Sequence, residues 1–514
     1  MFTKAYLGLI RTFKKYEKII FFILFGLLVF LSLFPRSVEV LNQNPVFGFD
    51  QGRDYLAVKS IVVNHKLTLI GAELGAGSAG ISGIFQGPGF FYLLAIPFVL
   101  FNGNPAGGTI LMFTLSVLAI LVGFLLGRKL FGVYGGIFTA LLISIAPVFI
   151  SQARFVWNPH TPTLFILLAF YFIYLSIATK KNIFVFLAAF FAGFIYNLEF
   201  GVSIPLCVSL FVFSIYLFKF QIKKYLFLFA GFFVVFSPMF FFEMRHKFLA
   251  LSGLISYISN PNKVPGPSNL SFAVDHAKSF IYGFGGTFPG INDFNFLLTF
   301  WGLTLALTLF FLIKEKNENL KKFYIFLLVL IPVTFSVFYF LKNSVWTYYL
   351  TDISLAYIFF FTYLIYVSYK RKFYKLNFGL IVILSLLILS AVNSSFKTTI
   401  YDYSDYGGTA KLKGKVDAID YIYKDAKGSP FGVMTYAPGI YTYPYDYLLW
   451  WYGKQKYNYL PYAQKKGIVY LLIEKDYERP WAVNGWLQTV IKNGTIIKTV
   501  TLPSGFVVQK RKFD

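Results

Sequence analysis

The sequence predicts a polytopic α-helical membrane protein with a small α/β domain at its carboxyl end. The 514 residues are 57% hydrophobic and only 13% charged, well below the charged share of about a quarter that is usual in soluble proteins. The mean hydropathy is +0.64. Apolar stretches follow one another up to residue 393, and the residues after it change to short strand-like runs beside one helical pattern.

Each predicted membrane helix is an apolar run long enough to cross about 30 Å of hydrocarbon. The first run follows a basic amino end, and no small-residue cleavage site precedes Pro35 and Arg36, so we predict an uncleaved signal anchor. About eleven spans are predicted, near residues 19–35, 109–127, 133–150, 161–178, 183–198, 201–218, 225–242, 296–313, 323–341, 346–368 and 376–393.

Residues 88–101 (PGFFYLLAIPFVLF) form a shorter apolar run that contains Pro97. If this run does not cross, every basic cluster between the later spans shares the side of the basic amino end, and the positive-inside rule makes that side cytoplasmic. We therefore predict a protein of the plasma (inner) membrane with a cytoplasmic amino terminus and with residues 88–101 in the interface or dipping back. The outer segments are then 36–108, 151–160, 243–295 and the chain beyond 394.

The tail is predicted to be an extracytoplasmic α/β domain of residues 394–514, appended to a membrane domain of residues 1–393. Its sequence KVDAIDYIYKDA has helical periodicity, whereas GVMTYA, GIVYLLIE, TIIKTVTL and GFVVQKR are β-branched or aromatic runs bounded by turn residues. Aromatic residues are concentrated at 441–462, where packing of the domain against the membrane is favoured over stacking on sugar rings.

Composition excludes some kinds of site. The formal charge of +25 lies largely in short clusters between apolar runs, which is typical of cytoplasmic loops and not of a face that binds nucleic acid. Cys207 is the only cysteine and there are four histidines, so neither a disulfide framework nor a thiolate or histidine metal cluster is predicted. Membrane lipids are the partners that this composition favours.

The first outer segment carries two acidic residues, Asp50 and Asp54, one helical turn apart. They stand at the start of a predicted helix whose apolar face holds Tyr55, Val58 and Ile61, an arrangement suited to the membrane interface. An aspartate at this place is often an N-cap, and a second one is often a solvated surface residue. The alternative is that a carboxylate held at the membrane surface acts as a general base toward a hydroxyl or an amine.

Three basic residues at outer helix ends are candidates for binding the phosphate of a donor. Arg154 fits either an interfacial arginine or a phosphate ligand, because a guanidinium forms paired bonds to phosphate oxygens. Arg245 and His246 lie where the predicted span 225–242 emerges, in FFFEMRHKF. A lone histidine is more often structural.

Further polar residues lie at the same predicted surface. Glu199 ends an apolar helix, where a carboxylate is costly unless it faces a polar cavity or a partner, and it is grouped with the residues expected to bind the donor. Tyr348 and Tyr349 fit either an aromatic belt or a substrate pocket. The polar residues that interrupt the apolar segments therefore lie nearly all at the predicted outer surface. This is expected for a reaction between a lipid-borne substrate and an acceptor outside the membrane.

The order of these features resembles the GT-C superfamily of integral membrane glycosyltransferases, in the branch of the protein O-mannosyltransferases and the lipid A aminoarabinose transferase. The matching parts are a basic amino end with one helix, an outer loop that opens with FDQGRD, the segment FQGPGFFYLLAIPFVLFNGNP, a helix ending in GRKLFG, the string FFFEMRH and a carboxyl-terminal outer domain. The long segment is similar to the H-P-P-L-Y-Y-x-L motif of that branch, with Gln86 and Gly87 in place of the histidine and the first proline. Gln51 stands where the family has the second acid of a D-E pair.

The resemblance implies transfer of a sugar from a polyprenyl-phosphate donor to an acceptor on the outer face, with inversion at the anomeric carbon. Asp50 matches the general base of the family, Asp54 is a second acidic candidate, and Gln86 is expected in the substrate pocket. The acceptor stays open among protein, lipid and glycan. No cofactor is certain, and a divalent cation such as Mg²⁺ or Mn²⁺ stays open, because two carboxylates supply few of the oxygen ligands that such an ion takes.

Two other functions fit the same composition, namely a transporter or flippase of lipid-linked glycans and a noncatalytic envelope assembly protein. A flippase is expected to have charged or Gly/Pro-broken helices near mid-membrane. Apart from Pro205, Pro238 and Pro332, the sequence offers little of that kind. It therefore favours the transferase.

Overall fold

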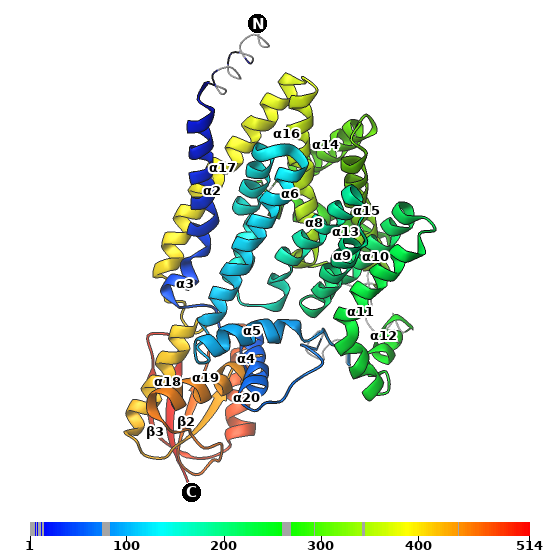
Figure 1. The fold of residues 1–514 in the computed structure, drawn as a ribbon. Coiled ribbons are helices and arrows are strands. Elements are labelled where there is room, and N and C mark those ends of the chain that lie inside the picture. The colour runs from blue at the N-terminus through cyan, green and yellow to red at the C-terminus, as the bar shows by residue number, and fades with distance from the viewer. Residues whose placement is uncertain are drawn as a thin grey trace.

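The computed structural model describes residues 15–73, 83–259, 269–291, 293–341, 345–439 and 441–514, together with residues 6, 8 and 12. Lys4, Arg11 and Lys14 of the predicted basic amino end lie outside these residues. The described chain forms a bundle of long helices with a small mixed domain at one end, and the first long helix begins at the opposite end (Figure 1).

Among the described residues, nine helices are long and apolar enough to cross a membrane. The predicted spans 109–127 and 133–150 are two helical arms within α6, because Gly132 between them has a non-helical conformation with a φ of 81° that favours glycine. The arms lie antiparallel, since a Cβ at Gly123 would lie 2.3 Å from the Ile143 side chain and one at Gly127 would lie 2.5 Å from that of Thr139. The predicted span 183–198 is a shorter apolar helix. This architecture confirms the prediction of an integral membrane protein. The nine are α2 (Glu17–Leu33), α6 (Gly107–Ile145), α8 (Pro162–Thr179), α10 (Phe200–Phe218), α11 (Ile222–Arg245), α14 (Phe294–Ile313), α15 (Glu318–Leu341), α16 (Thr351–Lys370) and α17 (Tyr374–Ser404).

The centre of the bundle is α16, and 94% of the residues in its apolar stretch are buried. A helix that is apolar on all sides is stable only when other elements surround it, and α16 packs against α6, α8, α13, α14 and α17. The shorter helices of the bundle and its ends are α7 (Pro147–Arg154), α9 (Asn182–Phe194), α12 (Leu249–Ser259) and α13 (Asn269–Thr287), with 3₁₀ turns η1 (Phe34–Arg36), η3 (Asn158–His160), η4 (Ile195–Asn197) and η6 (Thr347–Leu350).

The first outer segment forms α3 (Val38–Asn42), α4 (Phe49–Val62) and α5 (Gly89–Leu100). Helices α4 and α5 lie between the bundle and the mixed domain (Figure 1). With 12 residues, α5 is too short to span a bilayer, as predicted for residues 88–101. The apolar face of α4 differs from the prediction, because Tyr55 and Val58 are buried in protein, with Tyr55 against Phe98 and Tyr447.

The carboxyl-terminal domain contains a four-stranded sheet of order β1-β2-β4-β3. All four predicted strand runs are strands, and the predicted helix is α18. Strand β1 is parallel to β2, whereas β4 is antiparallel to both β2 and β3. The elements are α18 (Leu412–Ala426), β1 (Gly432–Tyr436), α19 (Tyr443–Leu448), the π-helix η7 (Leu449–Tyr457), β2 (Gly467–Ile473), α20 (Pro480–Trp486), the π-helix η8 (Leu487–Ile491), β3 (Thr495–Thr501) and β4 (Val507–Phe513).

Both faces of this sheet are covered, which explains why β2 is apolar throughout. Alternate residues of a strand point to opposite faces. Val469 and Leu471 belong to a small core with residues of α20, and Tyr470 and Leu472 belong to the main core, which includes residues of α18. The domain is therefore a sheet between two helical layers.

The aromatic segment at 441–462 packs on the first outer segment. Helix α19 crosses α4 at Gly52, where a Cβ atom would lie 2.3 Å from the backbone nitrogen of Pro444. The indole nitrogen of Trp451 donates to the carbonyl of Asn102, 3.0 Å away, and Lys59 of α4 lies 4.4 Å from the ring centroid of Trp450. These contacts fix the domain against α4 and the end of α5.

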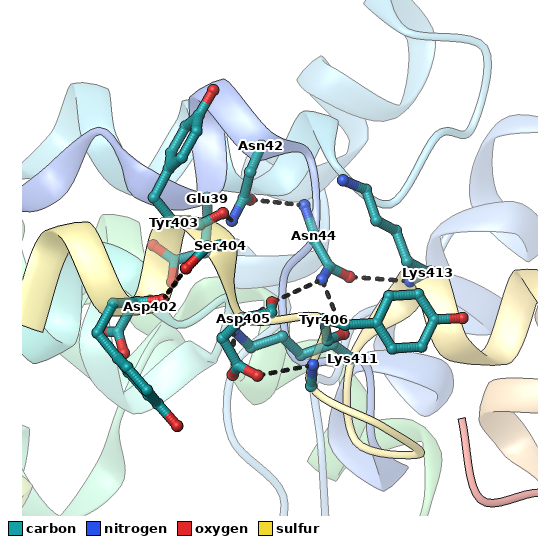
Figure 2. A network of polar contacts seen from close by, with 12 residues as sticks. Glu39, Asn42, Asn44, Asp402, Tyr403, Ser404, Asp405, Tyr406, Lys411 and Lys413 are labelled. Carbon is teal, nitrogen blue, oxygen red and sulfur yellow. Dashed lines mark hydrogen bonds and ion pairs between the residues drawn. The ribbon is translucent and has the colours of Figure 1, made fainter. Parts of the chain in front are cut away.

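The link between bundle and domain is held by buried polar contacts (Figure 2). Asn44 is 1% exposed, and its side chain accepts the N–H of Lys413 at 2.9 Å and donates to the carbonyl of Tyr406 at 3.0 Å. Lys411 pairs with Asp405 at 3.0 Å. The chain just before α4 is thereby tied to the chain just after α17.

Candidate active site

The acidic motif lies at the first turn of α4. The helix begins at Phe49 with Gly48 as its N-cap, and the Gln51 side chain accepts the N–H of Gly48 at 2.9 Å. The Gln51 amide also donates to the carbonyl of Val156, 2.8 Å away. The N-cap alternative for Asp50 is thus wrong, because the helix starts before it, and its carboxylate is not used to cap the backbone.

Asp50 and Asp54 share one arginine, Arg53. Nη1 of Arg53 lies 2.9 Å from Oδ1 of Asp50, and its Nε and Nη2 lie 2.9 and 2.8 Å from Oδ1 of Asp54. The Asp50 side chain is 33% exposed, and within the described part of the chain its Oδ2 has no hydrogen-bond partner. A carboxylate oxygen held at a rigid helix end and open to another molecule is what a general base requires.

Asp54 is the buried member of this group and is 1% exposed. The alternative of a solvated surface residue paired with Lys or Arg is therefore wrong about solvation, whereas the pairing with an arginine is confirmed. Oδ2 of Asp54 is buried without a hydrogen-bond partner. Burial raises the pKa of Asp54 to about 7, and the positive charge of Arg53 partly opposes this rise. Such a group is suited to anchoring Arg53, because it is too enclosed to meet a substrate.

Tyr348 lies in the turn η6, directly before the central helix α16. Its ring packs edge-on against Trp157 at 5.0 Å and against Tyr349 at 4.6 Å. Trp157 follows Val156, whose carbonyl accepts from Gln51 beside Asp50. The structure therefore links Tyr348 to the first turn of α4 through Trp157 and Val156.

Glu199 is the N-cap of α10 and is 3% exposed. Its Oε1 accepts the N–H of Gly201 at 3.0 Å, and its Oε2 lies 3.5 Å from the amide nitrogen of Gln86. The oxygen of Gln86 accepts from Asn158 at 2.7 Å. Burial raises the pKa of Glu199 to about 7, and the hydrogen bonds from Gly201 and Gln86 partly oppose this rise.

Gln86 thus connects the first outer segment to two others, in the position where the resembled motif has histidine. Tyr349 lies over Gly201 of the same region, since a Cβ at Gly201 would lie 2.4 Å from its ring. The role of these residues as a substrate pocket stays a prediction.

Arg154 lies apart from this group and is paired within the chain. Its Nε and Nη2 bond both oxygens of Glu39 at 2.9 and 2.8 Å, and Nη2 also lies 2.8 Å from Asp402. Two carboxylates on one guanidinium leave a net negative charge. This geometry does not favour Arg154 as a ligand for phosphate.

Arg245 and His246 are exposed at the end of α11. Within the described part of the chain Arg245 has no ion pair. Nδ1 of His246 lies 2.9 Å from the carbonyl of Phe242, and its ring stacks on that phenylalanine with centroids 4.1 Å apart. The histidine is thus held by its own helix, and the arginine is open to a ligand.

Metal binding has little support from the donor set. In the described ranges no group of three or more His, Cys, Asp or Glu side chains is arranged to hold an ion. Arg53 already lies between Asp50 and Asp54, so a divalent cation would have to displace it from that pair.

Sequence reasoning missed Arg53 and Asn158 as members of the site. Arg53 is visible in the string FDQGRD, three residues after Asp50, the spacing that lets side chains meet on a helix. No sequence signal identifies Asn158, because its partner Gln86 is distant in the chain and only the fold brings the two together.

Neither protein-family models nor curated proteins give a match to this sequence. Among solved structures, ArnT from Cupriavidus metallidurans bound to undecaprenyl phosphate aligns with a TM-score of 0.57 over 96% of this chain and 98% of its own, at 12% identity. The chain has the ArnT fold. The apo state of the same ArnT aligns with the same TM-score, identity and coverage. The fold expected from the resemblance is thereby confirmed.

Proposed function

We propose that this protein transfers a sugar from a polyprenyl-phosphate donor to an acceptor at the outer membrane surface, with inversion and with Asp50 as general base. The observation that carries the proposal is the free Oδ2 of Asp50, held at the start of a rigid helix next to Arg53. The ArnT fold along nearly the whole chain supports it, since one of those ArnT structures is bound to undecaprenyl phosphate.

The chemistry is a single displacement. Asp50 takes the proton of the acceptor hydroxyl or amine while the acceptor oxygen or nitrogen attacks the anomeric carbon, and the bond from that carbon to the phosphate oxygen breaks. The polyprenyl phosphate leaves with the bonding electron pair. Asp50 is protonated at the end and returns its proton to water.

The negative charge that grows on the leaving phosphate is best met by an arginine near Asp50, because preorganised charge stabilises a transition state. Arg53 fits this role on distance, since it contacts Asp50 directly. It pairs with two carboxylates, as Arg154 does, but burial raises the pKa of Asp54 to about 7 and so reduces the negative charge beside Arg53. Arg245, at the end of α11 without an ion pair among the described residues, is the second candidate. Arg154 is the third, because Glu39 and Asp402 already neutralise it.

The orientation in the membrane is part of the proposal. The carboxyl-terminal domain and α4, whose first turn carries Asp50, lie at one end of the bundle, opposite to the start of α2 (Figure 1). With the basic clusters in the cytoplasm, that end faces outward. Donor and acceptor then meet at the outer surface.

The direct test is to incubate the purified protein with a polyprenyl-phosphate sugar and a membrane extract as the source of acceptor. The proposal predicts release of polyprenyl phosphate together with label from the sugar in a new product. In sealed vesicles, movement of the intact lipid-linked sugar between leaflets without such release would support the flippase instead. Neither release nor movement would leave the assembly protein as the better account.

A further inference from the structure

A separate pocket lies between α17, α7 and the first outer segment, and it holds about 400 Å³. Helix α17 contributes one face of its outer half, with Ala391, Ser395, Thr398 and Asp402 spaced three to four residues apart. The opposite wall consists largely of the end of α6 and of α7. The pocket therefore opens beside a membrane-spanning helix, and its lining changes from apolar to polar toward the carboxyl end of α17.

The polar end of this pocket carries a net negative charge. Arg154 binds both oxygens of Glu39 and one oxygen of Asp402. Figure 2 shows Glu39 and Asp402 near the link to the carboxyl-terminal domain. Within the described part of the chain, Arg154 is the sole ion-pair partner of Asp402, whose side chain is 30% exposed. Asp402 thus has an oxygen left to accept a hydrogen bond.

The hydroxyl groups on α17 add hydrogen-bonding capacity without charge. Ser394, Ser395 and Thr398 all line the pocket, and Thr398 already donates to the carbonyl of Ser394 at 2.8 Å. A ligand for this end should therefore bring donors of its own, such as hydroxyl or ammonium groups. An anionic head group would be repelled by the net negative charge of Glu39, Asp402 and Arg154, and the described lining residues include no unpaired cation that would bind it.

The apolar part of the pocket indicates where the ligand comes from. Ile145, Pro147, Ile150 and Ala391 line it, and α17 is one of the candidate membrane spans. An alkyl chain gains free energy by leaving water for such a surface. The lining thus fits a molecule with a chain in the bilayer and a head group at the outer surface.

We propose that this pocket binds an amphipathic molecule whose head group is rich in hydroxyls or carries an ammonium, and that it discriminates against phosphate head groups. The proposal does not depend on the sugar transfer. The pocket is close to the candidate active site in the chain, because Val46 precedes Asp50 by four residues and Phe155 is next to Val156, whose carbonyl accepts from Gln51.

The test uses the full chain in lipid nanodiscs and three probes with the same chain, octyl glucoside, octylammonium and octyl phosphate, titrated calorimetrically below their critical micelle concentrations. Two variants on α17 are matched. Ser395→Phe fills the pocket, and Ser385→Phe places the same side chain at an exposed position outside the lining. Elution as a single species and wild-type helicity are required of both. Asp402→Asn, which removes charge with little change of shape, is the third variant.

We expect glucoside and ammonium to bind the wild type and Ser385→Phe alike, with phosphate weaker by about tenfold or more, the ratio that 1.4 kcal/mol gives. Ser395→Phe should abolish the binding, and Asp402→Asn should weaken ammonium more than glucoside. Octyl phosphate that binds as tightly as the glucoside would overturn the proposal. So would Ser395→Phe with wild-type affinities, or an equal loss in both phenylalanine variants.

Discussion

Replacing Gly52 with alanine is expected to destabilise the contact between α4 and the carboxyl-terminal domain. A Cβ there would lie 2.3 Å from the nitrogen and 2.6 Å from the Cα of Pro444, and 2.5 Å from the carbonyl carbon of Tyr443. Non-bonded carbon atoms pack at about 3.5–4.0 Å, so the two backbones must move apart by about 1 Å or more. These atoms belong to the backbone and cannot rotate away as a flexible side chain would.

Two effects of this substitution oppose each other, and their sizes decide the sign. Alanine is favoured over glycine inside a helix by about 1 kcal/mol, whereas overpacking costs about 1–3 kcal/mol. A contact this close belongs at the upper end of that cost, so net destabilisation is expected. In Gly302→Ala the added Cβ of α14 meets no heavy atom within 4 Å, and helix propensity acts alone.

The assay is thermal unfolding followed by tryptophan emission, since Trp450 and Trp451 lie at the contact. Gly52→Ala should lower the Tm, and Gly302→Ala should leave it unchanged or raise it. A Gly52→Ala protein that is as stable as the Gly302→Ala protein would refute the account of how the domain docks on α4.

Three further predictions concern the link, the arginine and a buried carboxylate. Asn44→Ala should cost about 1 kcal/mol, because the N–H of Lys413 loses its acceptor. Thermal unfolding measures this cost, and a cost no larger than that of the more exposed Asn42→Ala would contradict the link. Arg53→Ala should lower donor turnover by about 10²–10³, and Arg53→Lys should recover part of that loss. Full turnover in Arg53→Ala would show that Arg53 does not stabilise the leaving phosphate, and Arg245 would then be the better candidate. The pKa of Glu199 is raised to about 7, so the folded protein holds this proton more tightly than the unfolded chain does. The resulting contribution to folding stability is complete below about pH 4. It is lost as the pH rises through 7. The Tm of Glu199→Gln relative to wild type should therefore increase between pH 5 and pH 8, and a constant difference would show that Glu199 is ionised throughout.

Much of the fold could be predicted from the sequence, because its signals are local. Membrane spans follow from apolar length, and the four strand runs of the tail follow from β-branched residues between turns. The two spans within α6 were predictable in the same way, and Gly132 lies at the turn between them. The apolar face of α4 was assigned to the interface because the sequence does not reveal that α19 covers it.

The candidate site could be predicted in part, because some of its residues belong to a short local motif. Asp50 stands out because the string FDQGRD resembles the acidic motif that opens the outer loop in the GT-C branch. The pairing of Arg154 with Glu39 and Asp402 joins residues from three separate segments, whereas the sequence leaves Arg154 open between an interfacial arginine and a phosphate ligand. Whether a side chain is already neutralised depends on tertiary contacts, which no local pattern contains.

The central claim is that Asp50 removes the proton of the acceptor, and the most direct measurement is turnover of a polyprenyl-phosphate sugar by Asp50→Asn. Asparagine keeps the shape of the side chain and cannot take a proton at neutral pH. The account predicts that release of polyprenyl phosphate falls by at least about 10² while donor binding persists, and that Asp446→Asn, at an exposed carboxylate of α19, turns over like wild type. Wild-type turnover in Asp50→Asn would contradict it.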